Sequence, residues 1–308
     1  MSKPKILLDC DPGHDDAVAI LFAAKHTELL GITTVSGNVP LELTTRNALL
    51  TAQILGLDVP VYEGAAAPLT AVPTHAPDIH GETGLGGPVL PELTKELSGQ
   101  DAVRFLIDTV RSSEDVWLVP TGPLTNIALA IRQAPDIVSR LKGISLMGGS
   151  NFFGNRTPVA EFNILADPEA ADIVFRSGAR ILMSGLNLTH QFAVRRPDIA
   201  QIRAMDTSVS TFVADMLEFF AKTYEARYFG NFEGPLHDPC AVMALTHPEL
   251  FTFEARNVVV ELKGEHTRGM TVVDERGVRN DLPKNAEVGL KVKRDEAMKL
   301  LLKTIQAY

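Results

Sequence analysis

Ile6-Leu7-Leu8-Asp9-Cys10-Asp11-Pro12-Gly13-His14-Asp15-Asp16 is the stretch that decides the fold of this chain. An apolar run that ends in acids and then turns through Pro-Gly predicts a strand, a tight turn and the start of a helix. Its aspartates therefore gather where the carboxyl end of a strand meets the amino end of a helix. In open α/β sheets, that edge is the usual place for a bound ligand.

The carboxylates of this stretch need compensation, because like charges held close together repel one another. A hard divalent cation with oxygen ligands is the simplest candidate. Asp9 and Asp11 are predicted to share one face of the strand. Asp15 and Asp16 fall in the first helical turn, where the helix dipole favours acids. Helix capping in a solvated acidic turn is the plainer alternative.

Two other interpretations of the acidic stretch differ in how well its spacing fits. A calcium loop of the EF-hand type needs a bidentate Glu at a position that, counted from Asp9, is occupied by Ile20. A phosphohydrolase resembling the haloacid dehalogenases would use Asp9 as its nucleophile. That family usually continues its Asp-x-Asp motif with Gly-Thr, whereas Pro12-Gly13 follows here. The phosphohydrolase is kept as the second candidate.

Short apolar runs alternate with longer amphipathic stretches, which is typical of βαβ units around a mainly parallel sheet. Strands are expected near residues 6–8, 31–35, 116–119, 143–146 and 180–183. Helices are expected near residues 15–24, 42–55, 102–110, 124–132, 168–176 and 295–305, with a largely helical region at 197–229 and Val-rich strands at 256–292. We predict an α/β fold: an open, mainly parallel, Rossmann-like sheet flanked by helices, with residues 1–308 in a single domain.

Composition excludes several classes of protein. The 308 residues are 45% hydrophobic and 22% charged, which is ordinary for a soluble globular chain. A net charge of −9 argues against a nucleic-acid partner. No apolar run reaches the length of a membrane span and no signal peptide is evident, so we expect a cytoplasmic protein without a membrane partner. Cys10 is expected to be a buried, inert thiol.

Three distant motifs add polar groups, and two Gly/Pro-rich stretches, 73–91 and 148–158, are expected to be functional loops. Leu236–Pro239 places Asp238 beside His237, although such a triplet alone is more often a helix N-cap. Val119–Asn126 ends a strand, and Asn155–Asn163 alternates amides with a carboxylate. Amides and carboxylates together can donate to and accept from sugar hydroxyls.

Together these motifs resemble those of the nucleoside hydrolases, the calcium-dependent N-ribohydrolases often called inosine-uridine preferring. DCDPGHDDA at residues 9–17 looks like the family's N-terminal motif, and PLHDPCA at 235–241 like its late motif. The run GN-x-T-P-x-A-E-F-N at residues 154–163 resembles its ribose-binding segment. The motifs occur in the family's order from about residue 6 to about residue 245.

The resemblance implies a Ca²⁺ site and a nucleoside site. It assigns to the metal Asp11, Asp16, Asp238 and the backbone carbonyl of Thr121. It assigns to the substrate Asp15, Asn38, His80, Met147, Asn155, Glu161, Phe162 and Asn163, with His80 in a loop that closes on the ligand. Asp11 would be the general base, and His237 would assist the departing base by proton donation or hydrogen bonding. Whether His80 or His237 activates the base is left open.

The implied reaction is hydrolysis of the N-glycosidic bond of a ribonucleoside to free base and ribose. The segment 234–240 looks nearest to pyrimidine-preferring members, with uridine or cytidine favoured, although inosine-active relatives share it. Tyr224, Arg227 and Tyr228 fit a wall of the base pocket and plain helix surface equally well. The resemblance also implies a homodimer or homotetramer. A non-catalytic, calcium-dependent nucleoside binder is a further alternative, disfavoured by the presence of both Asp11 and His237.

Overall fold

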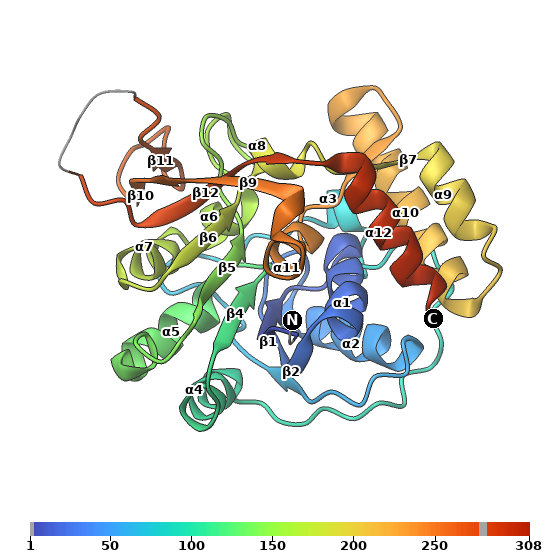
Figure 1. Ribbon diagram of the computed structural model, residues 1–308, viewed down its shortest axis with the longest axis horizontal. Coiled ribbons are helices and arrows are strands. Elements are labelled where there is room, and N and C mark those ends of the chain that lie inside the picture. The colour runs from blue at the N-terminus through green and yellow to red at the C-terminus, as the bar shows by residue number, and fades with distance from the viewer. Residues whose placement is uncertain (1–2, 277–281) are drawn as a thin grey trace.

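The computed structural model describes residues 3–276 and 282–308. Within these residues the chain builds a central sheet of eight strands between two layers of helices (Figure 1). In spatial order the strands are Val61–Glu63 (β3), Glu28–Thr34 (β2), Lys5–Cys10 (β1), Val116–Pro120 (β4), Gly143–Met147 (β5), Ile181–Ser184 (β6), Ala286–Val292 (β12) and Phe251–Arg256 (β9). All neighbouring pairs are parallel except β12 with β9. The predicted open, mainly parallel α/β sheet is confirmed.

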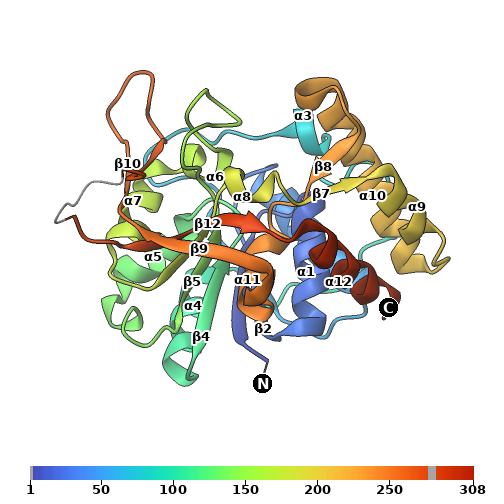
Figure 2. The same cartoon turned by 45° about the horizontal axis from the view of Figure 1, so that its top comes forward.

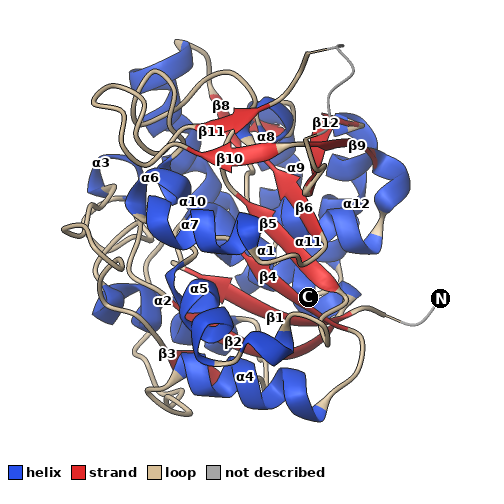
Figure 3. Ribbon diagram, turned by 90° about the vertical axis from the view of Figure 1, so that its left-hand side faces the viewer, coloured by secondary structure: helices blue, strands red, loops and turns tan. Residues whose placement is uncertain are grey.

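Helices cover both faces of this sheet (Figures 1 and 3). One layer consists of α4 (Ala102–Ser112), α5 (Thr125–Gln133) and α7 (Pro168–Arg176). The other consists of α1 (His14–His26), α2 (Leu41–Ile54), α11 (Pro239–Thr246) and α12 (Arg294–Gln306). Strand β1 serves both layers, because Ile6 and Leu8 join the core under α1 while Leu7 joins the core under α5. This alternation follows from the two-residue period of a strand.

Smaller elements extend one end of the molecule. Helix α9 (Arg196–Arg203) is followed by α10 (Ser208–Tyr224), which continues into the π-helix η2 (Glu225–Phe229). The short helix α3 (Pro77–His80) packs against α10, next to the small sheet of β7 (Ala193–Arg195) and β8 (Glu233–Pro235) (Figure 2). The remaining elements are α6 (Phe162–Ala166), α8 (Leu186–Thr189), η1 (Pro135–Ile137), η3 (Pro248–Leu250) and the antiparallel pair β10 (Val258–Val260) and β11 (Thr271–Val273).

The topology creates a natural binding edge. Strand β1 lies between β2 and β4: the chain runs from β1 to β2 and β3 on one side and then crosses over to β4 on the other, so the strand order reverses at β1. Ligands of open α/β proteins bind outside the carboxyl ends of the strands at such a switch point. The segments that follow β1, β2 and β4 carry Asp11, Asn38 and Thr121. The fold therefore brings three of the predicted site segments to one edge.

Most predicted elements lie within a few residues of the observed ones, and the predicted helix at residues 168–176 matches α7. One local expectation was wrong: β1 ends at Cys10, so Asp11 lies beyond the strand and does not share a strand face with Asp9. Cys10 and Cys240 are buried free thiols. Within the described residues, no helix combines the length and apolar character needed to cross a bilayer.

Candidate active site

A cavity opens at the carboxyl edge of the sheet, where open α/β proteins bind small molecules. Its walls are Asp15, Asn38, Ala76, Ile79, His80, Thr121, Met147, Asn155, Arg156, Glu161, Phe162, Asn163, Phe220, Tyr224, Tyr228, His237 and Asp238. The two Gly/Pro-rich loops both contribute to these walls, as expected. Every predicted site residue lines the cavity except Asp11 and Asp16.

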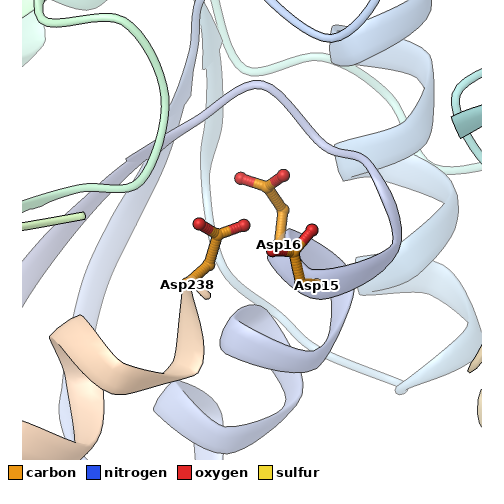
Figure 4. Close-up of side chains that lie close together, drawn as sticks. All are labelled: Asp15, Asp16 and Asp238. Carbon is orange, nitrogen blue, oxygen red and sulfur yellow. The ribbon is translucent and has the colours of Figure 1, made fainter. Parts of the chain in front are cut away.

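Three buried carboxylates meet beside the cavity, and two of them, Asp15 and Asp238, line it. Asp15 and Asp16 come from the first turn of α1, and Asp238 comes from the start of α11 (Figure 4). One oxygen of each lies within 4.8 Å of an oxygen of the other two. Asp238 occupies the N-cap position of α11 but accepts no capping hydrogen bond. Its carboxylate is therefore part of the acid cluster and does not cap the helix. This is contrary to the interpretation of the His-Asp-Pro triplet as a helix N-cap.

Asp16 has a double role. Its carboxylate accepts hydrogen bonds from the Gly13 backbone N–H at 3.0 Å and from the Thr121 hydroxyl at 2.8 Å. The first bond caps α1, as the capping interpretation expected. The second ties α1 to the segment after β4, so this acid fixes the edge of the sheet as well as contributing charge.

Asp11 stands beside this cluster. Its Oδ2 accepts a hydrogen bond from the Asn38 backbone N–H at 2.7 Å, while its buried Oδ1 has no partner within the described residues. A Cβ on Gly37 would lie 2.0 Å from Asp11 Oδ2, and a Cβ on Gly122 would lie 2.5 Å from Oδ1. Glycine at these two positions is thus required for the backbone to approach the carboxylate so closely.

Asp9 is sequestered from the cavity. Its Oδ1 accepts hydrogen bonds from Thr33 at 2.6 Å and Asn126 at 2.8 Å, and the side chain has no exposed surface. A nucleophile must reach its substrate, and Asp9 is not part of the cavity wall. The arrangement therefore gives no support to a phosphohydrolase that attacks through Asp9.

Burial and mutual repulsion disfavour ionisation of the acid cluster. Burial first, and then the charge of Asp16, raise the pKa of Asp11 well above its usual range. Burial and the neighbouring charges of Asp15 and Asp16 do the same to the pKa of Asp238. A cation among these groups would reverse the balance, because each ionised oxygen would then face an opposite charge.

Amide and carbonyl groups contribute to the cavity wall. Asn163 Nδ2 donates to the carbonyl oxygens of Thr121 at 2.6 Å and Met147 at 3.1 Å. Asn155 Oδ1 accepts from the backbone N–H of Phe162 at 2.9 Å. Each carbonyl and amide oxygen has two lone pairs, so these contacts leave capacity for a ligand.

Glu161 is held by the backbone. Its carboxylate accepts hydrogen bonds from the N–H groups of Gly149, Asn163 and Ile164 at 2.9–3.1 Å, and it forms the N-cap of α6. Burial nevertheless raises its pKa to about 7, and these hydrogen bonds only partly oppose the shift. The predicted ligand of a sugar hydroxyl is therefore also a structural cap.

Aromatic and histidine side chains form another part of the cavity wall. Tyr224 Oη lies 3.1 Å from His237 Nε2, and Thr189 Oγ1 lies 2.7 Å from His237 Nδ1. Burial, and then neighbouring positive charge, lower the pKa of His80 and of His237 well below the usual value, so both rings are neutral near pH 7. Phe220 packs edge-on against Tyr224 with ring centroids 4.9 Å apart.

The sequence analysis did not predict all of the residues in this part of the cavity wall. Tyr224 and Tyr228 do line the cavity, whereas Arg227 pairs with Asp78 at the surface. Ile79 and Phe220 line it without having been predicted. A helical apolar pattern identifies residues such as Phe220 as buried, but it does not distinguish a core neighbour from a cavity wall.

Comparison with known proteins supports the resemblance to the nucleoside hydrolases that the sequence motifs indicated. The family model of the inosine-uridine preferring nucleoside hydrolases matches residues 6–299. The chain is 45% identical over 312 residues to the pyrimidine-specific ribonucleoside hydrolase RihA of Shewanella woodyi, with 100% of this chain and 99% of the relative covered.

Solved structures agree with the sequence comparison. The purine-preferring ribonucleoside hydrolase from Gardnerella vaginalis has a TM-score of 0.92 and 36% identity, with 98% of each chain covered. The plant nucleoside hydrolase PpNRh1 has a TM-score of 0.90 and 32% identity, with 99% of each chain covered. The resemblance seen in the sequence motifs is thus confirmed, and this chain belongs to the family of inosine-uridine preferring nucleoside hydrolases, enzymes that cleave the N-glycosidic bonds of ribonucleosides.

Proposed function

We propose that this enzyme is a calcium-dependent hydrolase with a preference for pyrimidine ribonucleosides, uridine and cytidine. The observation that carries the proposal is a single cavity lined both by buried carboxylates of the acid cluster and by aromatic and neutral histidine side chains. A nucleoside has matching parts, because its ribose carries hydroxyls and its base is flat and largely apolar. The name of the Shewanella woodyi relative, which specifies pyrimidines, supports the choice of base.

The residues present fit Ca²⁺. The donor set consists of carboxylate and carbonyl oxygens, which are the ligands that hard cations prefer. Oδ1 of Asp11 is buried without a hydrogen-bond partner among the described residues, as expected of an oxygen that binds a metal ion. We assign Asp11, Asp16, Asp238 and the carbonyl of Thr121 as ligands. A carboxylate oxygen of Asp15 lies in the same group as those of Asp16 and Asp238. Asp15 is therefore assigned to the ribose on the condition that Asp11, and not Asp15, binds the metal.

Asp11 is our candidate for the general base. When bound, the ion would orient the ribose hydroxyls and the attacking water and polarise that water. Asp11 would accept the proton of the attacking water at its carboxylate, and a bound cation would favour the ionised form that this role requires. The Asn38 N–H bond to Oδ2 fixes the rotamer of the carboxylate and leaves Oδ1 available.

The ribose would be held by side chains that the structure already orients. We assign this role to Asp15, Asn38, Met147, Asn155, Glu161, Phe162 and Asn163. Glu161 would also stabilise positive charge developing on the sugar as the bond to the base breaks. Because three backbone N–H groups hold its carboxylate, it needs no reorientation during the reaction.

The base would lie among Phe220, Tyr224 and His237. A departing pyrimidine anion is a poor leaving group unless a proton or a hydrogen bond reaches it. The hydroxyl of Tyr224 and Nε2 of His237 are in mutual hydrogen-bond contact, so the pair can pass a proton toward the cavity. His237 is therefore placed to assist the leaving group.

A panel of ribonucleosides assayed for free ribose, with and without a chelator, tests this proposal. We expect ribose from uridine and cytidine faster than from inosine, and loss of activity with chelator that added Ca²⁺ restores. Chelator-resistant turnover would overturn the metal assignment. Faster release from inosine than from either pyrimidine would overturn the base preference. The predictions of a homodimer or homotetramer and of a cytoplasmic location are addressed by sedimentation and by fractionation of cells.

A further inference from the structure

Arg156 places a positive charge in the wall of a cavity that is proposed to bind a neutral nucleoside. Among the described residues that line this cavity, no other is Arg or Lys. Its guanidinium carbon lies 5.5 Å from the ring centroid of Phe162, and it directly follows Asn155 in the chain. The side chain is 22% exposed, so it borders both the cavity and solvent. Nothing in the reaction described above uses this charge.

The partners of Arg156 neutralise its charge only in part. Its Nη1 lies 3.4 Å from each carboxylate oxygen of Asp78, which is longer than the usual N–H···O hydrogen bond. Asp78 also pairs with Arg227. Two guanidinium groups therefore share one carboxylate, which leaves one positive charge in excess among these three side chains. Nη2 of Arg156 donates to the carbonyl oxygen of His75 at 3.1 Å, but a carbonyl carries no charge.

The acids of the cavity wall do not supply the missing charge. Asp15, Glu161 and Asp238 line the same cavity, but in the part of the chain that the structure describes none of them forms an ion pair or hydrogen bond with Arg156. A guanidinium has five N–H donors, and within the same residues Nε makes no hydrogen bond. Arg156 therefore has both charge and donors available for a ligand.

The proposed function indicates which part of a nucleoside is near this arginine. A cation binds adjacent hydroxyls most readily, and in a ribose these are the 2′- and 3′-hydroxyls. The base is on C1′, so the 5′-hydroxyl is the polar group of the sugar that neither the metal nor the base accounts for. Phe162 and Asn155 are assigned to the ribose and adjoin Arg156, and the Phe162 N–H donates to Asn155 Oδ1 at 2.9 Å. The 5′ position is therefore the one that Arg156 can recognise.

We propose that the cavity also binds ribonucleoside 5′-monophosphates, with the phosphate on Arg156 and with the sugar and base in the places proposed for the nucleoside. The inference rests on the proposed function for the orientation of the sugar. A planar guanidinium binds phosphate through paired N–H···O bonds. Because Arg156 is partly exposed, the phosphate keeps part of its hydration, which limits the cost of desolvation. A nucleotide bound in this way excludes the nucleoside from the cavity.

Competition against uridine in the Ca²⁺-loaded enzyme tests this binding, with uridine 5′-monophosphate as the probe and ribose release as the readout. We expect competitive inhibition that weakens with added salt. Arg156→Gln removes the charged partner of the phosphate, so the inhibition constant should rise about tenfold, whereas KM for uridine should change no more than about threefold. If both constants changed by the same factor, Arg156 would serve the nucleoside or the fold, and the proposal would be wrong.

Asp78→Asn tests the same contact in the opposite direction. Loss of the carboxylate removes the competitor of the phosphate, so the inhibition constant for uridine 5′-monophosphate should fall about threefold. A purely structural role predicts weaker inhibition in both variants, because both break the ion pair between Arg156 and Asp78. Weaker inhibition in Asp78→Asn therefore contradicts the proposal. Arg104→Gln breaks the exposed Arg104–Asp108 pair and is the matched control, which should leave the inhibition constant unchanged.

Two further measurements separate this inference from its alternatives. Inorganic phosphate alone should compete with uridine much more weakly than the nucleotide does, and equal competition would show a general anion site instead of a nucleotide site. Calorimetry of uridine 5′-monophosphate with the Ca²⁺-loaded protein and with Arg156→Gln does not depend on turnover. If the unaltered protein cleaves no nucleoside, the proposed function fails, whereas calorimetry still decides whether Arg156 binds the nucleotide. Absence of binding overturns the inference even in an enzyme that cleaves uridine.

Discussion

Single residues carry the chemistry, and Asp11 is the most consequential of them. Its carboxylate is positioned by Asn38 and by the close approach of two glycines. We expect Asp11→Ala to lower kcat about 100- to 10,000-fold while the protein stays folded, because a general base contributes on this order. Ribose release and circular dichroism are the measurements. Asp58→Ala, which removes an exposed carboxylate, is the control. Near-normal turnover would exclude Asp11 as the base.

His237 is expected to act on the leaving base and not on the sugar. Purine and pyrimidine bases differ in the positions that accept a proton, so His237→Ala should lower kcat unequally for inosine and uridine. The two substrates are compared under the same saturating conditions. His247→Ala removes a histidine outside the cavity and serves as the control. Equal losses for both substrates would show that His237 serves the fold or the sugar instead.

Glu161 makes stability depend on pH in a defined direction. Its pKa is raised from 4.5 to about 7 by burial, so between these values the folded state binds more protons than the unfolded state. Its contribution to stability is thus largest below about pH 4.5 and declines as the pH rises toward 7. The stability of the metal-free enzyme relative to Glu161→Gln should fall across this window in denaturant titrations. A relative stability that rises with pH would contradict the assignment.

At the scale of elements, three segments meet above the cavity. Asp78 in α3 pairs with Arg156, 3.4 Å away, and with Arg227 in η2, and Tyr228 Oη contacts the carbonyl of Asn155 at 3.4 Å. These contacts join α3, the loop before α6 and η2. Arg156 and Tyr228 line the cavity but are not among the residues assigned to the reacting bond, so we expect these contacts to affect binding more than chemistry.

We expect Asp78→Asn to change KM by no more than about fivefold with little effect on kcat, because partly exposed ion pairs contribute at most about 1 kcal/mol. The KM of the unaltered enzyme should depend on salt more than that of the variant. Asp108→Asn breaks the exposed Arg104–Asp108 pair and is the matched control. A large fall in kcat would show that Asp78 takes part in the reaction itself.

At the scale of the whole molecule, the proposed metal links strands, loops and two helices. Of the proposed ligands, Asp16 lies on α1, Asp238 is the N-cap of α11, and Asp11 and Thr121 follow β1 and β4; all are buried. Ca²⁺ at about 100 times its dissociation constant would stabilise the fold by about 2.7 kcal/mol, which raises Tm by roughly 5 °C in a chain of this size. Thermal unfolding with chelator and with Ca²⁺ measures this shift.

Asp238→Asn provides the control for the metal effect, because it removes one charge from the cluster and conserves side-chain volume. In this variant the Ca²⁺-dependent rise in Tm should largely disappear, while the Tm in chelator should not fall, since repulsion among the acids is relieved. An equal response to Ca²⁺ in both proteins would place the ion elsewhere.

Much of the molecule follows from the amino-acid sequence. The alternation of apolar runs and amphipathic stretches predicted the strands and helices of the parallel sheet, since period and length are local properties. The motif at residues 9–17 placed acids at the end of β1, and the family resemblance supplied the remaining site residues. The sequence missed β3 and the short helices α3, α6 and α8, because three to five residues give too little periodicity to recognise.

Only the tertiary structure decided how these residues are combined. It brought Asp238 to Asp15 and Asp16 across more than 220 positions of sequence, buried Asp9 away from the cavity and gave Tyr224 a partner in His237. It also paired His14 with His80, which no local pattern indicates. The physical reason is that periodicity and turn residues are set by neighbours in the chain, whereas burial, charge and protonation depend on which distant groups the fold places in contact.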